Sequence, residues 1–266
     1  HKSSTYADMP MLHSLTNGSL LMAFQTSRTY EGADEQYIAV SYAEDLEGLH
    51  WSEPVPLTVS RKGPQWAPVL HRDDHGHMWL FYTEGSECKY SSEEPVKWMP
   101  GGDLKVTMWI GSGNPKWKTP RTILTQEAAG HVPLMVGNKM IVLSTGEWVL
   151  PYWTEKHSTG TCEFDKTAEG YAAVLVSVDG GWTWTSRGRV TSPQTWLIEN
   201  TVVELKSGSL LMFFRSVKGA VFIATSDDKG FSWSLPTAAE PALPNPDSKV
   251  AAIRLEDKML ALGFNN

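Results

Sequence analysis

The sequence has few cysteines, no long apolar run and no surplus of positive charge, and each shortage excludes a class of protein. Two cysteines, Cys88 and Cys162, stand far apart among 266 residues. They could form one bridge, but a chain of this size can bury a core without cross-links, so we expect two free thiols. The apolar runs are only a few residues long, far short of the roughly 20 that a membrane-spanning helix needs. With a net charge of −7, the protein is not expected to bind nucleic acid.

A short motif occurs twice at a fixed spacing. Residues 177–184 read Ser-Val-Asp-Gly-Gly-Trp-Thr-Trp, and residues 226–233 read Ser-Asp-Asp-Lys-Gly-Phe-Ser-Trp. In each copy the Asp side chain can bond the backbone of its own turn, the Gly accepts a positive φ, and the last Trp can pack on a neighbouring strand. An altered third copy with extra residues spans 41–51. Repetition of such a motif indicates a repeat architecture.

A second repeat marks where each unit begins. Residues 17–24 and 207–214 both place a tight Gly-Ser turn before an apolar strand, and a short apolar strand precedes each turn. Similar units start near residues 9, 67, 132, 201 and 250. Their spacing of roughly 50 to 65 residues matches β-propeller blades of four strands, and helical periodicity is absent.

These motifs are Asp-boxes, and the chain resembles the sialidase superfamily, also called the neuraminidase or BNR-repeat family, over essentially its whole length. The resemblance implies an all-β propeller, with six blades when complete and a glycan site at its centre. Residues 1–266 would form a single domain with about four and a half of these blades. Because the fifth unit stops after its second strand at Asn266, we expect the protein to continue beyond this residue.

The sharpest match to the family lies in residues 199–215. By resemblance, Glu199 would polarise the catalytic nucleophile, a tyrosine expected beyond Asn266, and Arg215 would bind a substrate carboxylate. A carboxylate and a guanidinium at neighbouring strand ends can bind an anion in fork geometry. They can equally form a structural ion pair at the edge of a blade, and the sequence leaves both interpretations open.

A second match is the loop after the second strand, residues 28–34. The family places an arginine and an acid/base aspartate there, so Asp34 is the candidate proton donor, Glu31 is the alternative, and Arg28 would help to bind the substrate. Loops on a rigid scaffold often carry functional residues, although these charges could also form only a solvated turn.

One position departs from the family. Sialidases begin the first blade with Arg-Ile-Pro, whereas this chain has Asp8-Met9-Pro10. A carboxylate at Asp8 would repel the carboxylate of a sialic acid rather than bind it. A uronic acid or a neutral sugar therefore fits better than sialic acid.

Two further segments are weaker candidates. Residues 244–249 precede the fifth unit, and Asn245 and Ser248 could bond sugar hydroxyls unless this is only a proline-rich turn. Residues 71–77 contain three histidines, but a hairpin turn explains them more readily than a zinc site. We expect neither a metal nor another cofactor.

The sequence thus predicts an exo-acting glycoside hydrolase that removes a terminal sugar, sialic acid or another, from a glycan. The alternative is a non-catalytic propeller that binds glycans or proteins, because a fold alone does not imply an activity. We expect a monomer, and secretion or a periplasmic location is expected by analogy with the glycan-directed role.

Overall fold

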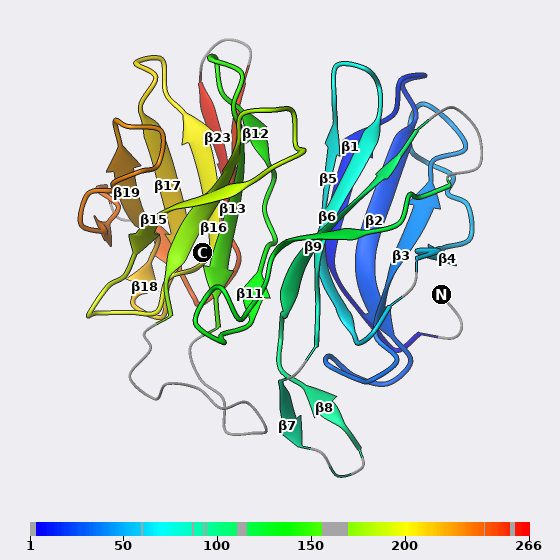
Figure 1. The fold of residues 1–266 in the computed structure, drawn as a ribbon. Coiled ribbons are helices and arrows are strands. Elements are labelled where there is room, and N and C mark those ends of the chain that lie inside the picture. The colour runs from blue at the N-terminus through cyan, green and yellow to red at the C-terminus, as the bar shows by residue number, and fades with distance from the viewer. Residues whose placement is uncertain are drawn as a thin grey trace. The chain divides into compact units, whose positions relative to one another are not determined.

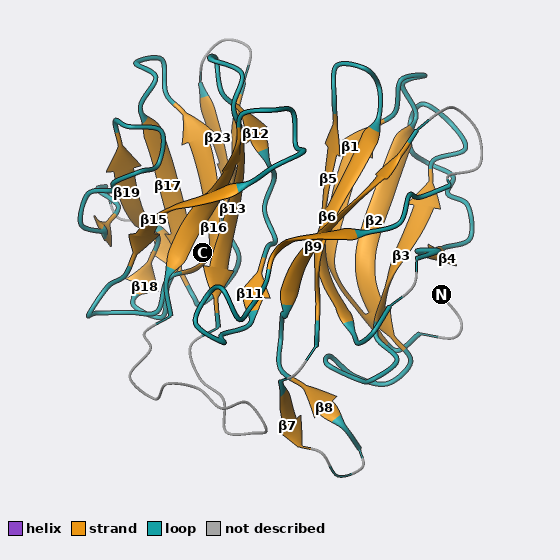
Figure 2. Ribbon diagram, viewed as in Figure 1, coloured by secondary structure: helices purple, strands orange, loops and turns teal. Residues whose placement is uncertain are grey.

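A computed structural model describes residues 4–59, 61–86, 88–91, 93, 95–110, 116–155, 170–241, 243–255 and 259–266. These residues form strands, turns and loops (Figures 1 and 2). No helix able to cross a membrane occurs in this part of the chain. The described residues divide into two compact units, 4–136 and 137–266.

The first unit contains two four-stranded antiparallel sheets and a small hairpin. The first sheet has the order β1 (Tyr6–Ser14), β2 (Leu20–Ser27), β3 (Tyr37–Tyr42), β4 (Val55–Pro56). The second has the order β10 (Arg121–Leu124), β9 (Asp103–Trp109), β6 (Met78–Glu84), β5 (Gln65–Arg72). The hairpin is β7 (Lys89–Ser91) and β8 (Lys97–Trp98), and β11 (Leu134–Met135) follows later in the chain.

The second unit repeats the pattern. In its first sheet β12 (Ile141–Val142) pairs with β13 (Trp148–Thr154), followed by β14 (Ala172–Ser177) and β15 (Thr185–Val190). Its second sheet has the order β16 (Ile198–Glu204), β17 (Leu210–Arg215), β19 (Phe222–Ser226), β20 (Thr237–Ala238). Two short pairs complete it, β18 (Gly219–Ala220) with β21 (Pro244–Asn245) and β22 (Ala251–Arg254) with β23 (Leu260–Gly263).

The strand order within each sheet confirms the predicted units. Within these sheets neighbouring strands follow one another in the chain, except that the β7–β8 hairpin is inserted between β6 and β9 and the short β18 between β17 and β19. This is the meander typical of a propeller blade. The expected starts near residues 9, 67, 201 and 250 fall in or beside β1, β5, β16 and β22. The described residues therefore form four such sheets and the first hairpin of a fifth.

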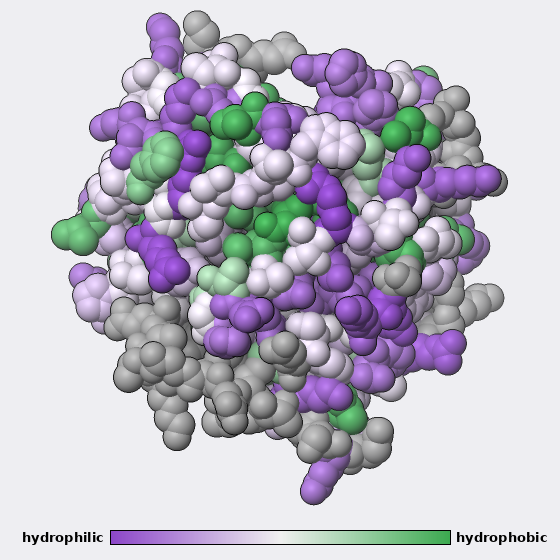
Figure 3. Space-filling model, viewed as in Figure 1, coloured by the Kyte–Doolittle hydropathy of each residue, from purple (hydrophilic) through white to green (hydrophobic). Residues whose placement is uncertain are grey.

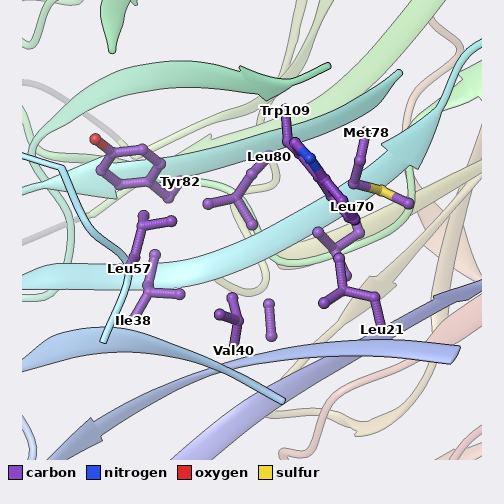
Figure 4. Packing of buried hydrophobic residues seen from close by; sticks show 10 residues of the cluster. Leu21, Ile38, Val40, Leu57, Leu70, Met78, Leu80, Tyr82 and Trp109 are labelled. Carbon is purple, nitrogen blue, oxygen red and sulfur yellow. The ribbon is translucent and has the colours of Figure 1, made fainter. Parts of the chain in front are cut away.

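The core of the first unit lies between its two sheets. Leu21, Ile38 and Val40 from β2 and β3 pack against Leu70 and Leu80 from β5 and β6, and all five are at most 2% exposed (Figure 4). The side chains come from alternate positions of each strand, so one face of each sheet supplies them. By contrast, the face drawn in Figure 3 is mostly hydrophilic, with hydrophobic residues in smaller patches.

The first Asp-box forms a network centred on one carboxylate. Asp179 Oδ1 accepts hydrogen bonds from the Ser177 hydroxyl at 2.8 Å and the Thr183 amide at 2.8 Å, while Oδ2 accepts the Thr183 hydroxyl at 2.6 Å. The Trp184 indole nitrogen donates to Gly181 O at 2.9 Å. These bonds, those from Thr183 first, lower the pKa of Asp179 to about 2.

The second Asp-box has the same network. Asp228 accepts hydrogen bonds from the Ser226 hydroxyl and from the Ser232 amide and hydroxyl, and the bonds from Ser232 lower its pKa to about 2. Trp233 Nε1 donates to Gly230 O at 3.1 Å. The repeated sequence thus encodes a repeated set of hydrogen bonds.

The tryptophan of the second Asp-box packs against the preceding sheet at a glycine. Gly188 in β15 has a φ of +58°, and a β-carbon built there would lie 2.5 Å from Trp233 Cδ1 and 2.6 Å from Gly230 O. Neither of these two atoms can move away freely, because one belongs to the packed indole ring and the other to the backbone. Gly188 is therefore required for the two sheets of this unit to pack.

The cysteine prediction is wrong for Cys88. This residue is buried, with 3% exposure, and is disulfide-bonded. Cys162 lies outside the described residues. The expectation of free thiols rested on chain length, which shows only that a cross-link is not needed and not that it is absent.

Replacing Gly188 with alanine should destabilise the protein by about 2–5 kcal/mol, the sum of a left-handed conformation for a residue with a β-carbon and overpacking. Gly208→Ala is the matched control, because Gly208 has a φ of +88° but no atom within 4 Å of the point where a β-carbon would lie. It should cost only the conformational part, about 1–2 kcal/mol. Urea unfolding measures both, and equal losses would show that the packing contact with Trp233 contributes nothing.

Stability should depend on Asp179 in a pH-specific way. Because its folded pKa is about 2 against an ordinary value of 3.8, the ionised carboxylate stabilises the fold above pH 4, and this contribution is lost as the pH falls towards 2. Asp179→Asn should therefore lower the Tm most at neutral pH, and the deficit should shrink by pH 3. Asp74→Asn, at an exposed turn position, is the control. A deficit that stays constant with pH would contradict this origin.

Candidate functional site

Glu199 lies at an irregularity in β16. The pairing of β16 with β17 shifts register between Ile198 and Thr201, and Glu199 has a φ of +49°. A left-handed conformation costs a residue with a β-carbon about 1–2 kcal/mol, so neighbouring contacts must hold it. The side-chain amide of Asn138 does so, because its nitrogen donates to Glu199 O at 2.7 Å and Val250 O at 3.0 Å. Such bulges redirect side chains relative to a regular strand.

The bulge places Glu199 against Arg215 at the end of β17. Arg215 Nη1 donates to Glu199 Oε2 at 3.1 Å, and Arg215 Nε donates to Asp247 Oδ1 at 2.8 Å. Burial alone would lower the pKa of Arg215, but hydrogen bonds and charges from Asp247 and Glu199 outweigh it and raise the pKa. We call these three residues the Arg215 triad.

Sequence reasoning identified two of the three members of the triad. The Glu199–Arg215 pair follows from the hairpin, in which Ile198 stands directly opposite Arg215. Asp247 was missed, although it lies in the loop that the sequence singled out. Its φ of +58° turns it towards Arg215, and nothing in the local sequence reports a contact with a residue 32 positions away.

The loop that carries Asp247 is shaped by Asn245. Asn245 Oδ1 accepts hydrogen bonds from the backbone amides of Ser216 and Ser248, and its Nδ2 donates to Ser248 O at 2.8 Å. The side chain is buried and uses its polar atoms inside the protein. This differs from the expected role of bonding a sugar. The Ser248 hydroxyl, in contrast, is buried and has no hydrogen-bond partner among the described residues.

A second polar cluster forms in the first unit around Tyr6. The Tyr6 hydroxyl accepts a hydrogen bond from Gln25 Nε2 at 2.6 Å and lies 3.4 Å from Asp8 Oδ2. Asp8 Oδ1 accepts the amide of Met9 at 2.7 Å, where β1 has its own register shift and Met9 has a φ of +54°. Gln25 Oε1 also accepts the amide of Ala67 at 2.8 Å. Asp8 is therefore presented by the same kind of bulge as Glu199.

Glu31 belongs to this cluster. Burial of its carboxyl group among neighbouring side chains raises the pKa of Glu31, and the negative charge of Asp8 raises it further. A hydrogen bond from Tyr6 and the charge of Lys97 act in the opposite direction. The residue as a whole still reaches solvent, so its carboxyl group can exchange protons at a higher pH than an ordinary glutamate.

The other candidates on this loop have different surroundings. Asp34 Oδ1 accepts a hydrogen bond from the indole nitrogen of Trp98 at 2.8 Å. Arg28 is exposed, and its backbone amide donates to Glu35. The structure thus brings Glu31, and not Asp34, to Tyr6 and Asp8. The histidine-rich turn is organised by Asp73, which bonds the amide of His77 and the indole of Trp79.

Comparison with known proteins shows the family to which this chain belongs. Residues 18–266 match the BNR repeat-like domain. The chain belongs to the BNR repeat-like family. No curated protein matches it.

The solved structures that resemble this member of the BNR repeat-like family include sialidases. A protein of unknown function from Dyadobacter fermentans is 17% identical with a TM-score of 0.77, over 98% of this chain and 75% of that one. The Hadza microbial sialidase Hz136 is 19% identical with a TM-score of 0.72, over 95% and 51%. Trypanosoma rangeli sialidase, solved with the inhibitor DANA, is 16% identical with a TM-score of 0.67, over 96% and 43%.

These similarities establish the fold as a sialidase-type β-propeller. The chain spans about half the length of the sialidases it matches. At identities below 20% the likeness concerns the fold, and the activity must be argued from the residues.

The raised pKa of Glu31 has a measurable consequence for stability. Below its ordinary pKa of 4.5 the carboxyl group is protonated whether the chain is folded or not. As the pH rises through the higher folded pKa, ionisation destabilises the folded state. Glu31→Gln should therefore leave the Tm unchanged at pH 4 and raise it relative to the wild type at pH 8. Glu127→Gln, an exposed position, should show no such trend. A Glu31→Gln difference that is independent of pH would contradict the shift.

Proposed function

We propose that this protein is an exo-acting glycoside hydrolase that removes a terminal sugar from a glycan. The observation that carries the proposal is the position of Glu199. A strained bulge, held by Asn138, keeps Glu199 buried and its carboxylate against Arg215. Strain of this kind persists only where surrounding contacts enforce it, and it is concentrated at functional sites.

The proposed role of Glu199 is to increase the nucleophilicity of a hydroxyl group that attacks the anomeric carbon. A carboxylate can accept a proton from such a hydroxyl as the bond to carbon forms. Arg215 fixes the orientation of Glu199 through the bond at 3.1 Å. Two of the structural relatives are sialidases by name, which supports a proposal of glycoside hydrolysis.

Glu31 is the better of the two candidates for the proton donor. A general acid must keep its proton near the working pH, and the pKa of Glu31 is raised. Asp34 instead accepts a hydrogen bond from the indole nitrogen of Trp98 at 2.8 Å, which commits one of its carboxylate oxygens to that contact. We therefore propose Glu31, rather than Asp34, as the general-acid candidate of the first unit. The disulfide at Cys88 supports the expected export, because disulfides persist in oxidising compartments.

The proposal predicts that Glu199→Gln lowers kcat by about 100-fold or more, the usual contribution of acid–base assistance. The assay uses the full-length protein with 4-methylumbelliferyl glycosides of neutral, amino and acidic sugars. Glu240→Gln, an exposed glutamate in the same unit, should retain wild-type activity. Both variants should have wild-type unfolding midpoints.

Two outcomes would contradict the proposal. Full activity in Glu199→Gln would remove Glu199 from the chemistry. An absence of hydrolysis for every glycoside, together with measurable sugar binding, would favour the non-catalytic binding propeller. The paired carboxylates around Arg215 are the observation that gives this alternative its support, because they satisfy the guanidinium without any substrate.

A further inference from the structure

The Arg215 triad has more negative than positive charge. One guanidinium faces two carboxylates, Glu199 at 3.1 Å and Asp247 at 2.8 Å. Arginine recognises a carboxylate best through two parallel N–H bonds from one edge of its fork. Nε and Nη1 of Arg215 are already donated to Asp247 and Glu199. A substrate carboxylate would have to bind through the remaining N–H groups of Nη1 and Nη2, beside two carboxylates that are already in place.

The burial of the triad makes a third carboxylate costly. The Glu199 side chain is 11% exposed and that of Arg215 is 26% exposed, so solvent screens their interactions only in part. A third negative charge brought close would meet a site that is already net negative, and like charges in such surroundings repel strongly. The Asp247 side chain is 49% exposed, which makes it the member of the triad that can be changed with least effect on folding.

The polar cluster of the first unit, considered by itself, also has more negative than positive side chains. The cluster around Tyr6 combines the carboxylates of Asp8 and Glu31 with one nearby ammonium group, that of Lys97. The loop that contains Glu31 adds Asp34 and Glu35 against the single positive charge of Arg28. Neither cluster therefore has a surplus of positive charge for an acidic sugar.

A neutral polar group belongs to the same loop as Asp247. The Ser248 hydroxyl follows Asp247 in the chain and is buried without a hydrogen-bond partner among the described residues. Burial of an unpaired hydroxyl is unfavourable. An uncharged sugar, unlike an acidic one, brings no charge repulsion to this loop.

We infer that the sugar bound at the Arg215 triad carries no carboxylate, and that Asp247 is the residue that excludes acidic sugars. This inference extends the proposed function. It rests on the proposed function only for the premise that a sugar binds at the triad. It distinguishes this protein from an enzyme that binds sialic acid or a uronic acid through a free arginine. Asp247 acts through Arg215, because it holds Nε and adds a negative charge beside any carboxylate that the guanidinium would bind.

Binding measurements on the full-length protein test this inference without requiring turnover. Titration calorimetry uses the methyl glycosides of galactose, glucose, fucose, glucuronic acid and N-acetylneuraminic acid as probes. For the wild type, at least one neutral glycoside should bind, about tenfold or more tighter than either acidic one, a ratio that corresponds to about 1.4 kcal/mol. Asp247→Asn should raise the affinity for the acidic glycosides relative to the neutral ones by about tenfold.

Matched variants distinguish a change in sugar selectivity from a general loss of folding. Asp247→Glu keeps the carboxylate and should restore the exclusion of acidic sugars. Asp227→Asn, which removes one exposed negative charge elsewhere in the same unit, should leave the affinity ratio unchanged. A loss of folding would weaken binding of all probes together and would not alter their ratio in favour of acidic sugars.

The inference and the proposed function can fail separately. Neutral sugars that bind selectively without being hydrolysed would support the inference and contradict the hydrolase. Hydrolysis of a sialoside or a uronide in preference to neutral glycosides would support the hydrolase and overturn the inference. An affinity ratio that Asp247→Asn does not change, or an absence of binding for every probe, would also overturn it.

Discussion

The structure of both polar clusters depends on a left-handed residue placed in the first strand of a sheet. Met9 in β1, Ala67 in β5 and Glu199 in β16 have φ values of +54°, +45° and +49°, and each coincides with a register shift against the next strand. None of them is glycine, so each costs about 1–2 kcal/mol that other contacts must offset. Because side chains alternate along a regular strand, a single extra residue changes which side chains face the same way.

Side-chain amides hold two of these bulges in place. In the first unit Gln25 accepts the amide of Ala67, and in the second unit Asn138 donates to the carbonyl of Glu199. Both amides are almost fully buried. A buried amide that lost such a bond would be left unsatisfied, so the bond and the strained backbone stabilise each other. Glu199 is consequently held in place before any ligand arrives, and Asp8 is positioned by its own bond from the amide of Met9.

Local hydrogen bonding explains how much of the fold could be predicted. In the Asp-boxes the carboxylate, its donors and the packing tryptophan lie within eight residues, so the sequence alone predicted the turns correctly. Spacing of these turns then predicted the sheets and their starts. The Glu199–Arg215 pair was also predictable, because a hairpin brings the two residues together through adjacent strands. By contrast, Asp34 and Glu31 differ only in what surrounds them, and Trp98 and Tyr6 come from elsewhere in the chain.

The sequence by itself determined the all-β class, the repeated blades and the family, because these depend on periodic patterns and short motifs. Only the tertiary structure decided the chemistry of the candidate site. It brought Asp247 to Arg215 across 32 residues, placed Glu31 beside Asp8, and gave Asn245 a buried structural role. It also showed that Cys88 is disulfide-bonded. The physical reason is that a side chain's charge state and available hydrogen bonds depend on its spatial neighbours, and these are set by packing between strands far apart in the chain.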